Sequence, residues 1–369
     1  MLNVENCRNR QHRLLREMEA QGLGIVVLGN PKTIYYFAGA LVDPSWPQLF
    51  ALAASGKSLL VTNQEPKQSA ADRVELYTGY TLDRVFGIAT MNAEAAGFLR
   101  NFSSAAPGSA GLDFEFANYG LAETLVGRNV SNITPALDEL RRVKDPDEIE
   151  CMRATVALVE AGYAAIKSKL EPGMTEYQAF NIIYEAIVNR AETSVEFKGD
   201  FACGARGIRG GGPPTSRKVQ PGDTYILDLF PIYNGYMCDL CRTFAAGKPS
   251  QLQQDAWAHI MEAHRIAGKI LRPGARARDV YQEIRLHLDS FTPAKGSFFH
   301  HAGHGLGMNG WEFPWLTPGS DQVIQEGEVI ACEPGLYSEA MQGGIRLEHN
   351  YLVDKDSVTA LDGFPMDLR

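Results

Sequence analysis

The sequence predicts an α/β N-terminal domain followed by an α+β domain with an internal pseudo-two-fold repeat. Three observations predict this arrangement. The chain has 369 residues, more than twice the commonest domain length of about 100–150 residues. Helical and strand-like patterns alternate up to about residue 140, and after it an order of two helices followed by strands occurs twice. We therefore expect domains at residues 1–140 and 141–369.

The first domain is expected to begin with an amphipathic helix and a buried strand. The helix covers 8–22, with Leu14 and Met18 on its apolar side, and the strand is the apolar run 24–30. Further strands are expected at 49–54, 58–62, 75–80 and 110–114, with helices near 92–101 and 118–127. We find no catalytic constellation in these residues.

The second domain is expected to open with a long helix at a capping box. Asp145 is suited to the N-cap, Pro146 to the first helical position, and Glu148 to the position that reaches back to the cap. The helix should end at the Pro-Gly pair 172–173. Thr175 and Gln178 then form a second capping box, which should open a helix over 176–189.

The same order of elements returns about a hundred residues later. Leu170 and Phe180 around the first Pro-Gly break match Leu271 and Tyr281 around the second, at a constant offset of 101 residues. A duplicated half-domain is favoured over a chance match because the order of the elements repeats as well. Pockets often form between packed units, so we expect the functional groups between the two halves.

Composition and charge exclude several classes of protein. The net charge of -9 argues against a general nucleic-acid binder. No segment has the length and apolarity of a membrane span or a secretory signal, so a cytoplasmic protein without membrane association is expected. The six cysteines are scattered, which favours reduced thiols, and the pair Cys238 and Cys241 is interpreted as strand residues rather than a zinc or redox site.

A hairpin signal brings two carboxylates together. Strands are expected at 224–231 and 236–244, joined by a turn at Asn234-Gly235. In that register Asp228 and Asp239 are diagonal neighbours on one face. They could lie on the exposed face of an edge hairpin, but their apolar neighbours favour a buried pair that a cation compensates.

The second half of this domain supplies matching groups. Glu333 and Glu348 again follow strand-like runs, and His300, His301 and His304 lie within five residues, with glycines on both sides of His304. Four carboxylates and one imidazole suit Mn, Fe, Co or Zn. We expect two divalent ions that generate and position a hydroxide.

The motifs that carry these residues resemble metallopeptidase family M24. They are D-L-x8-C-D-L-C-R-T-F, G-H-G-L-G, C-E-P-G-L-Y and G-G-I-R-L-E. The resemblance implies the pita-bread fold, preceded by a creatinase-type domain as in aminopeptidase P and prolidase. It also implies a set of five metal ligands, namely Asp228, Asp239, His304, Glu333 and Glu348.

The same resemblance implies an activity. It indicates an Xaa-Pro aminopeptidase or dipeptidase that cleaves a peptide or amide bond with a metal-bridging hydroxide, most readily with two manganese ions, although Co, Zn or Fe would also suit. Glu333 would shuttle the proton of the water, and His300 matches an additional active-site histidine. The partner is expected to be a small peptide or another small molecule, and the protein a homodimer.

Two departures from the family pattern bear on the substrate. Family peptidases usually have histidines at the positions that are Gly211 and Trp311 here. Trp311, Arg209 or Arg346 could replace the lost donors, so these residues and Gly211 are expected to line the substrate pocket. Alternatively, the substrate is a non-peptide small molecule, for a C–N hydrolase or a lyase, or the protein binds metal without catalysis. The glycine-rich loop 207–217 is interpreted as a pocket wall rather than a phosphate cradle.

Overall fold

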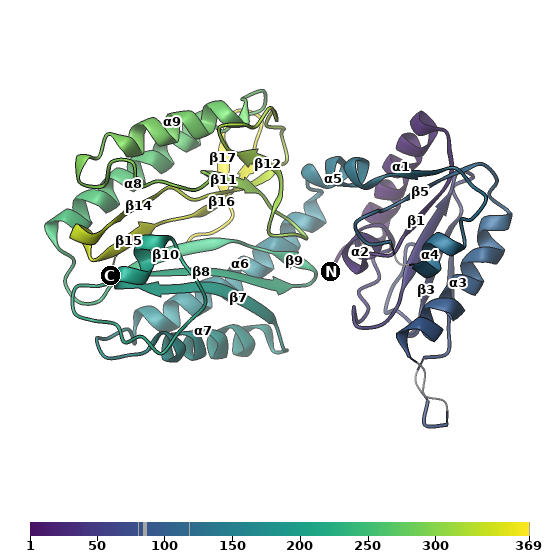
Figure 1. The fold of residues 1–369 in the computed structure, drawn as a ribbon, viewed down its shortest axis with the longest axis horizontal. Helices are drawn as coiled ribbons and strands as arrows, with labels where there is room; N and C mark the ends of the chain where they lie inside the picture. Colours follow the sequence, from purple (N-terminus) through teal and green to yellow (C-terminus); the bar gives the residue numbers. More distant parts are fainter. Residues whose placement is uncertain (80, 84–86, 118, 369) are drawn as a thin grey trace. The chain divides into compact units, whose positions relative to one another are not determined.

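The N-terminal unit, Met1–Arg141, is a mixed sheet covered by helices (Figure 1). The computed structural model describes residues 1–79, 81–83, 87–117 and 119–368 of the chain. The strand order in this sheet is β4-β3-β2-β1-β5-β6. The strands are β1 (Leu23–Leu28), β2 (Leu49–Ala53), β3 (Ser58–Thr62), β4 (Arg73–Leu76), β5 (Ser109–Leu112) and β6 (Val130–Asn132). The helices are α1 (Val4–Gln21), α2 (Pro31–Ala38), α3 (Ile88–Ser104), α4 (Tyr119–Glu123) and α5 (Thr134–Arg142), whose last residue belongs to the second unit.

Most of the predicted elements of this unit are confirmed, but several differ in extent, and the first helix begins at Val4 rather than at residue 8. The strand expected at 75–80 ends at Leu76, because β4 pairs in parallel with β3, which ends at Thr62. The helix expected at 118–127 ends at Glu123, where the chain tightens into turns whose N–H groups bond to carbonyls three residues back. Residues 80 and 118 of these two predictions lie outside the described residues.

The C-terminal unit, Arg142–Arg369, is built twice from a helix pair and a sheet. Helices α6 (Pro146–Lys167) and α7 (Glu176–Ala191) precede β7 (Glu196–Cys203), β8 (Thr224–Tyr233), β9 (Tyr236–Met237) and β10 (Leu240–Ala245). Helices α8 (Gln251–Ile270) and α9 (Ala277–Asp289) precede the second set of strands. That set is β11 (Gly303–Gly305), β12 (Glu312–Leu316), β13 (Val329–Cys332), β14 (Gly335–Ser338), β15 (Gly343–Arg346), β16 (His349–Val353) and β17 (Val358–Ala360). The predicted repeat is therefore present.

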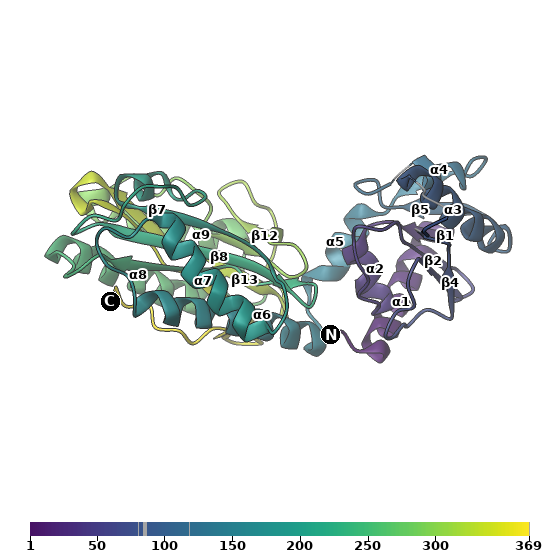
Figure 2. The same ribbon diagram turned by 90° about the horizontal axis from the view of Figure 1, so that it is seen from below.

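The sheets of this unit lie between the two helix pairs (Figures 1 and 2). One sheet has the strand order β10-β8-β7 and the other β12-β11-β13-β16-β17, while β14 and β15 form a separate hairpin. The second helix pair buries residues such as Ile260 and Ile284 against Ile330 and Leu336 in a continuous apolar core. Both predicted capping boxes are confirmed, at the N-termini of α6 and α7. No helix in the described part of the chain is both long and apolar enough to cross a membrane.

Candidate metal centre

Two carboxylates of the site come from one hairpin. β8 turns at Asn234, whose φ of 50° suits the two-residue turns of hairpins, and Tyr233 then pairs with Tyr236 in the predicted register. The same register continues into β10. Asp228 and Asp239 therefore lie diagonally on one face of the sheet, as the sequence predicts.

The returning strand is interrupted at the second of these carboxylates. The prediction of one strand over 236–244 is wrong, because β9 ends at Met237 and β10 begins at Leu240. The N–H of Asp239 donates to Asn350 Oδ1 at 3.1 Å, and Asn350 Nδ2 donates to the carbonyl of Asp239. A side chain of β16 thus takes the backbone groups that a strand would use, and it fixes Asp239 in place.

The second half places the remaining three ligand candidates opposite this hairpin. His304 lies on β11 and pairs with Ala331 of β13, and Glu333 directly follows β13. Glu348 lies between β15 and β16, and its N–H donates to the carbonyl of Cys241 at 3.1 Å. This bond ties a ligand candidate of the second half to a strand of the first half.

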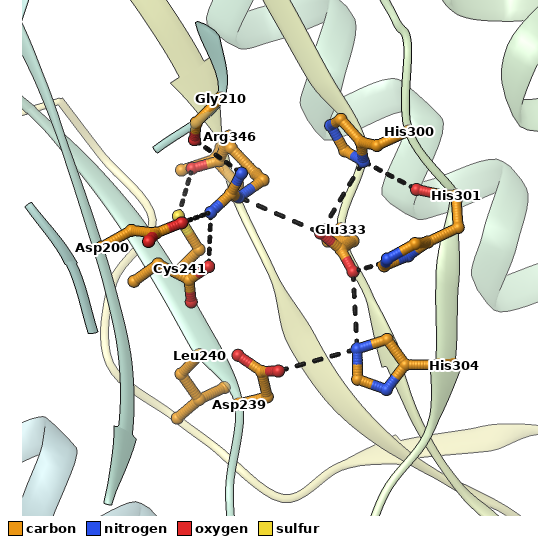
Figure 3. A network of polar contacts seen from close by, with 12 residues as sticks. Asp200, Gly210, Asp239, Leu240, Cys241, His300, His301, His304, Glu333 and Arg346 are labelled. Carbon is orange, nitrogen blue, oxygen red and sulfur yellow. Dashed lines mark hydrogen bonds and ion pairs between the residues drawn. The ribbon is translucent and has the colours of Figure 1, made fainter. Parts of the chain in front are cut away.

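His304 presents a lone pair to the carboxylates. Its Nδ1 lies 3.0 Å from the carbonyl of Gly305, which can only accept, so the proton is on Nδ1. Its Nε2 lies 3.6 Å from Asp239 Oδ2 and 3.6 Å from Glu333 Oε1 (Figure 3). These separations suit donor atoms around a common cation.

Three of the carboxylates form a buried acidic cluster. Asp228, Asp239 and Glu348 each offer an oxygen within 4.8 Å of the others. Burial raises the pKa of Asp228 to about 6, and burial with the neighbouring carboxylates raises the pKa of Asp239 and Glu348 well above its ordinary value. Among the described residues, both oxygens of Glu348 and one of Asp228 have no hydrogen-bond partner. Buried oxygens in this state need a cation, so the residues fit divalent metal ions.

Glu333 behaves differently from these three. Burial acts to raise the pKa of Glu333, but contact with His301 and the nearby His300 and Arg346 outweigh it and lower that pKa to about 2. Glu333 is therefore ionised throughout the neutral range.

Arg346 links the site to the glycine-rich loop. Its Nη1 donates to the carbonyl of Gly210 at 2.7 Å, and its Nη2 contacts Asp200 at 3.2 Å and also Asp228 (Figure 3). Its Nε lies 4.0 Å from Glu333. The guanidinium thus bridges two carboxylates of neighbouring strands and holds the loop beside them.

The two other histidines of the cluster have unequal surroundings. His300 uses both ring nitrogens, since Nδ1 bonds the carbonyl of His301 at 2.8 Å and Nε2 bonds the hydroxyl of Tyr337 at 2.7 Å. Burial lowers the pKa of His300 to about 4. His301 Nδ1 lies 3.0 Å from Glu333 Oε1, whereas the nearest distance from His300 to that carboxylate is 3.7 Å.

A cavity of about 870 Å³ opens above these groups. Of the residues predicted for the site, the cavity is lined by Arg209, Gly211, Asp228, Asp239, His300, His304, Trp311, Glu333 and Arg346. Glu348 is buried beneath them. Trp311 is 69% exposed and its ring also contacts Trp315, so it both lines the cavity and joins an aromatic cluster.

Asp200 and His301 are among the residues of this wall to which sequence reasoning gave no role. Asp200 pairs with Asp228 across β7 and β8, so it shares the face of the ligand candidates. A Cβ on Gly211 would lie 1.9 Å from Asp200 Oδ2, which shows that the carboxylate fills the space beside this glycine. The strand pairing of 196–203 would have indicated Asp200, and the adjacent histidines pointed to His301 without giving it a role.

Comparisons with known proteins agree with this fold. The model of metallopeptidase family M24 matches residues 150–355, and that of the creatinase/prolidase N-terminal domain matches residues 10–143. The Xaa-Pro dipeptidase of Pyrococcus furiosus is 24% identical over 361 residues, covering 96% of this chain and 97% of the relative. YkvY of Bacillus subtilis is 29% identical over 233 residues, which span 63% of each chain.

Solved structures show the same fold over the whole length. The Xaa-Pro dipeptidase from Bacillus anthracis superposes with a TM-score of 0.84 at 22% identity, covering 98% of this chain and 99% of that one. The prolidase from Pyrococcus furiosus gives a TM-score of 0.79 at 21% identity, covering 95% and 99%.

The fold and the oxygen-rich donor set define a metal-dependent hydrolase with a creatinase-type N-terminal domain and a pita-bread domain. The chain belongs to metallopeptidase family M24, whose members act with divalent metal ions.

Proposed function

We propose that the chain is a two-metal hydrolase of the Xaa-Pro dipeptidase type. The observation that carries the proposal is the convergence of five donor residues from both halves of the unit at the base of one cavity. The donors are Asp228, Asp239, His304, Glu333 and Glu348. The Xaa-Pro dipeptidases among the similar proteins support the substrate class.

These five residues would hold the two ions. When bound, the ions supply an activated water as the nucleophile and polarise the carbonyl of the scissile bond. The oxygen-rich set favours manganese over cobalt, zinc or iron. We retain the cytoplasm and a homodimer as predictions.

Glu333 would move the proton in the reaction. Its carboxylate is ionised, because its pKa is lowered to about 2, and it faces the cavity. It would take the proton of the attacking water and deliver it to the departing nitrogen as the C–N bond breaks. His300, held by Tyr337, would stay neutral near pH 7 and orient the substrate from the cavity wall.

A specific observation favours a second candidate, a related hydrolase or lyase of a non-peptide small molecule. The side of the cavity at Gly211 presents the carboxylate of Asp200, and the side at Trp311 presents an indole. Neither position offers the imidazole donor that the family resemblance implies. A substrate without a proline ring or a free peptide carboxylate would then fit this wall.

A substrate screen tests both candidates. The protein is stripped with chelator, reloaded with Mn²⁺, and assayed against a panel of Xaa-Pro dipeptides, N-acyl amino acids and other small amides. Turnover of Xaa-Pro dipeptides that Asp239→Asn abolishes supports the peptidase. Turnover only of non-peptide amides supports the second candidate, and metal binding without turnover of any compound contradicts both.

A further inference from the structure

We infer that His301 is a sixth metal ligand, on the side of the centre formed by His304 and Glu333. This inference rests on the proposed two-metal function and adds a nitrogen donor to the five residues named above. The contacts of His301 carry it.

The position of His301 Nδ1 is that of a ligand atom. It lies 3.0 Å from Glu333 Oε1, and that oxygen lies 3.6 Å from His304 Nε2. His301 Nδ1 is buried and has no hydrogen-bond partner among the described residues, so its lone pair is available to an ion. Donor atoms about 2.0–2.2 Å from one ion and at right angles to each other lie about 3 Å apart. The pair of His301 and Glu333 has this separation.

His300 does not compete for this position. Both of its nitrogens already bond, to the carbonyl of His301 and to the hydroxyl of Tyr337. Ligation by either nitrogen of His300 would require the hydrogen bond of that nitrogen to break, whereas ligation by His301 Nδ1 breaks none.

The ring of His301 is held in place by aromatic neighbours. It stands edge to face against Trp315, at 5.3 Å between ring centroids, and against His304, at 5.2 Å. Figure 3 shows His301 and His304 directed at the same oxygen of Glu333. Packing of this kind orients a ligand before the ion binds, which reduces the entropy cost of binding.

A second imidazole makes the two ion positions chemically unequal. Imidazole suits zinc and iron, whereas carboxylates suit manganese. The position beside His301 and His304 should therefore bind Zn²⁺ more tightly than the position beside Asp228.

Counting coordinated nitrogens tests the inference directly. Stripped protein is reloaded with Mn²⁺ and examined by pulsed EPR, which detects nitrogen bound to the ion, and metal affinity is measured by calorimetric titration. His301→Phe keeps a ring against Trp315, and His300→Phe is the matched control. Thermal unfolding without metal verifies that each variant is folded.

We expect two coordinated nitrogens in the wild type and in His300→Phe, and one in His301→Phe. Loss of a residue that only hydrogen-bonds to a metal ligand weakens metal affinity by about 10–100-fold. Loss of the ligand itself in His301→Phe should therefore weaken binding at one ion position by at least this factor. Two bound ions with a single coordinated nitrogen in the wild type, or an unchanged count in His301→Phe, would overturn the inference and leave the proposed function standing. A wild type that binds no ion would overturn both.

Discussion

At the scale of single residues, the carboxylate of Asp239 is expected to favour metal binding but to destabilise the metal-free protein. Burial and the neighbouring carboxylates raise its pKa, so the folded state holds a proton that the unfolded state releases above about pH 4. The contribution of Asp239 to the stability of the metal-free protein is therefore fully present below about pH 4. It is lost as the pH rises through the pKa of this group in the folded state. Metal ions remove this penalty.

Asp239→Asn should therefore stabilise the metal-free protein and weaken metal binding. In chelator, the gain in Tm over the wild type should be larger at pH 8 than at pH 5, because the destabilisation from the raised pKa of Asp239 grows as the pH rises. With metal present the order should reverse, because the variant gains less from binding. Comparing the two proteins at each pH cancels the opposite effect of His300, whose lowered pKa costs stability as the pH falls below about 6.5. A variant less stable than the wild type in chelator at pH 8 would contradict the assignment.

Gly211 and Asp200 should behave as a coupled pair. Gly211→Ala should cost about 1–3 kcal/mol in the free energy of unfolding, because the new methyl group overlaps the carboxylate of Asp200. Asp200→Ala in the same chain should restore most of that loss, which denaturant titration of the two single variants and the double variant measures. Gly319→Ala is the control, since its added Cβ meets no atom within 4 Å. Additive effects of the two substitutions would show that they do not share the space.

Trp311 should govern substrate preference without holding metal. Its indole lines the cavity and is 69% exposed. Trp311→His should leave metal content unchanged and raise the kcat/KM for Xaa-Pro dipeptides relative to other amides, by up to about 10²-fold if the imidazole recovers one oxyanion donor. Unchanged ratios for every substrate that the wild type accepts would place Trp311 outside the reaction.

Residue types and their spacing could predict much of the candidate site. The Asn-Gly turn sets the register of the hairpin, and that register alone places Asp228 beside Asp239. Such reasoning gave no role to His301 or Asp200. Whether a histidine in a run of three faces the site depends on its side-chain direction, and the place of Asp200 depends on a strand pairing between distant segments.

At the scale of elements, a buried ion pair fixes the strands that carry the ligand candidates. Asp362 is buried and accepts hydrogen bonds from Arg242 Nη2 at 2.6 Å and His349 Nδ1 at 2.8 Å. The same Arg242 donates to the carbonyl of Glu348 at 2.6 Å. The segment after β17 thereby supports β10 and Glu348.

Asp362→Ala should destabilise the protein by about 3–5 kcal/mol, because it leaves the guanidinium of Arg242 buried without its carboxylate. Asp367→Ala is the control, since its ion pair with Lys167 is partly exposed and should contribute less than about 1 kcal/mol. Denaturant unfolding of both variants measures the difference. Equal losses would show that burial does not determine the strength of the two pairs.

Element boundaries could be predicted where the cause is local. The capping boxes at Thr175 and Asp145 each involve residues three apart, and both helices begin as expected. The break between β9 and β10 has a distant cause, the amide of Asn350, and no pattern near residue 238 indicates it.

At the scale of the whole molecule, the duplicated order of elements accounts for where the donors meet. Each half ends in strands that carry carboxylates, and the structure brings the two sets together at one cavity. The repeat could be read from the offset of 101 residues. The distances between the halves could not, because they depend on side-chain packing and on bonds such as that from Glu348 to Cys241.

The metal content of the purified protein tests the central claim most directly. The chain is purified without chelator, resupplied in separate samples with Mn²⁺, Co²⁺ and Zn²⁺, and freed of loosely bound ions before elemental analysis. We predict two ions per chain for the wild type with at least one of these metals, and fewer for Asp239→Asn and for Glu348→Gln. A wild type that holds no metal under all three conditions would contradict the assignment of Asp228, Asp239, His304, Glu333 and Glu348 as ligands.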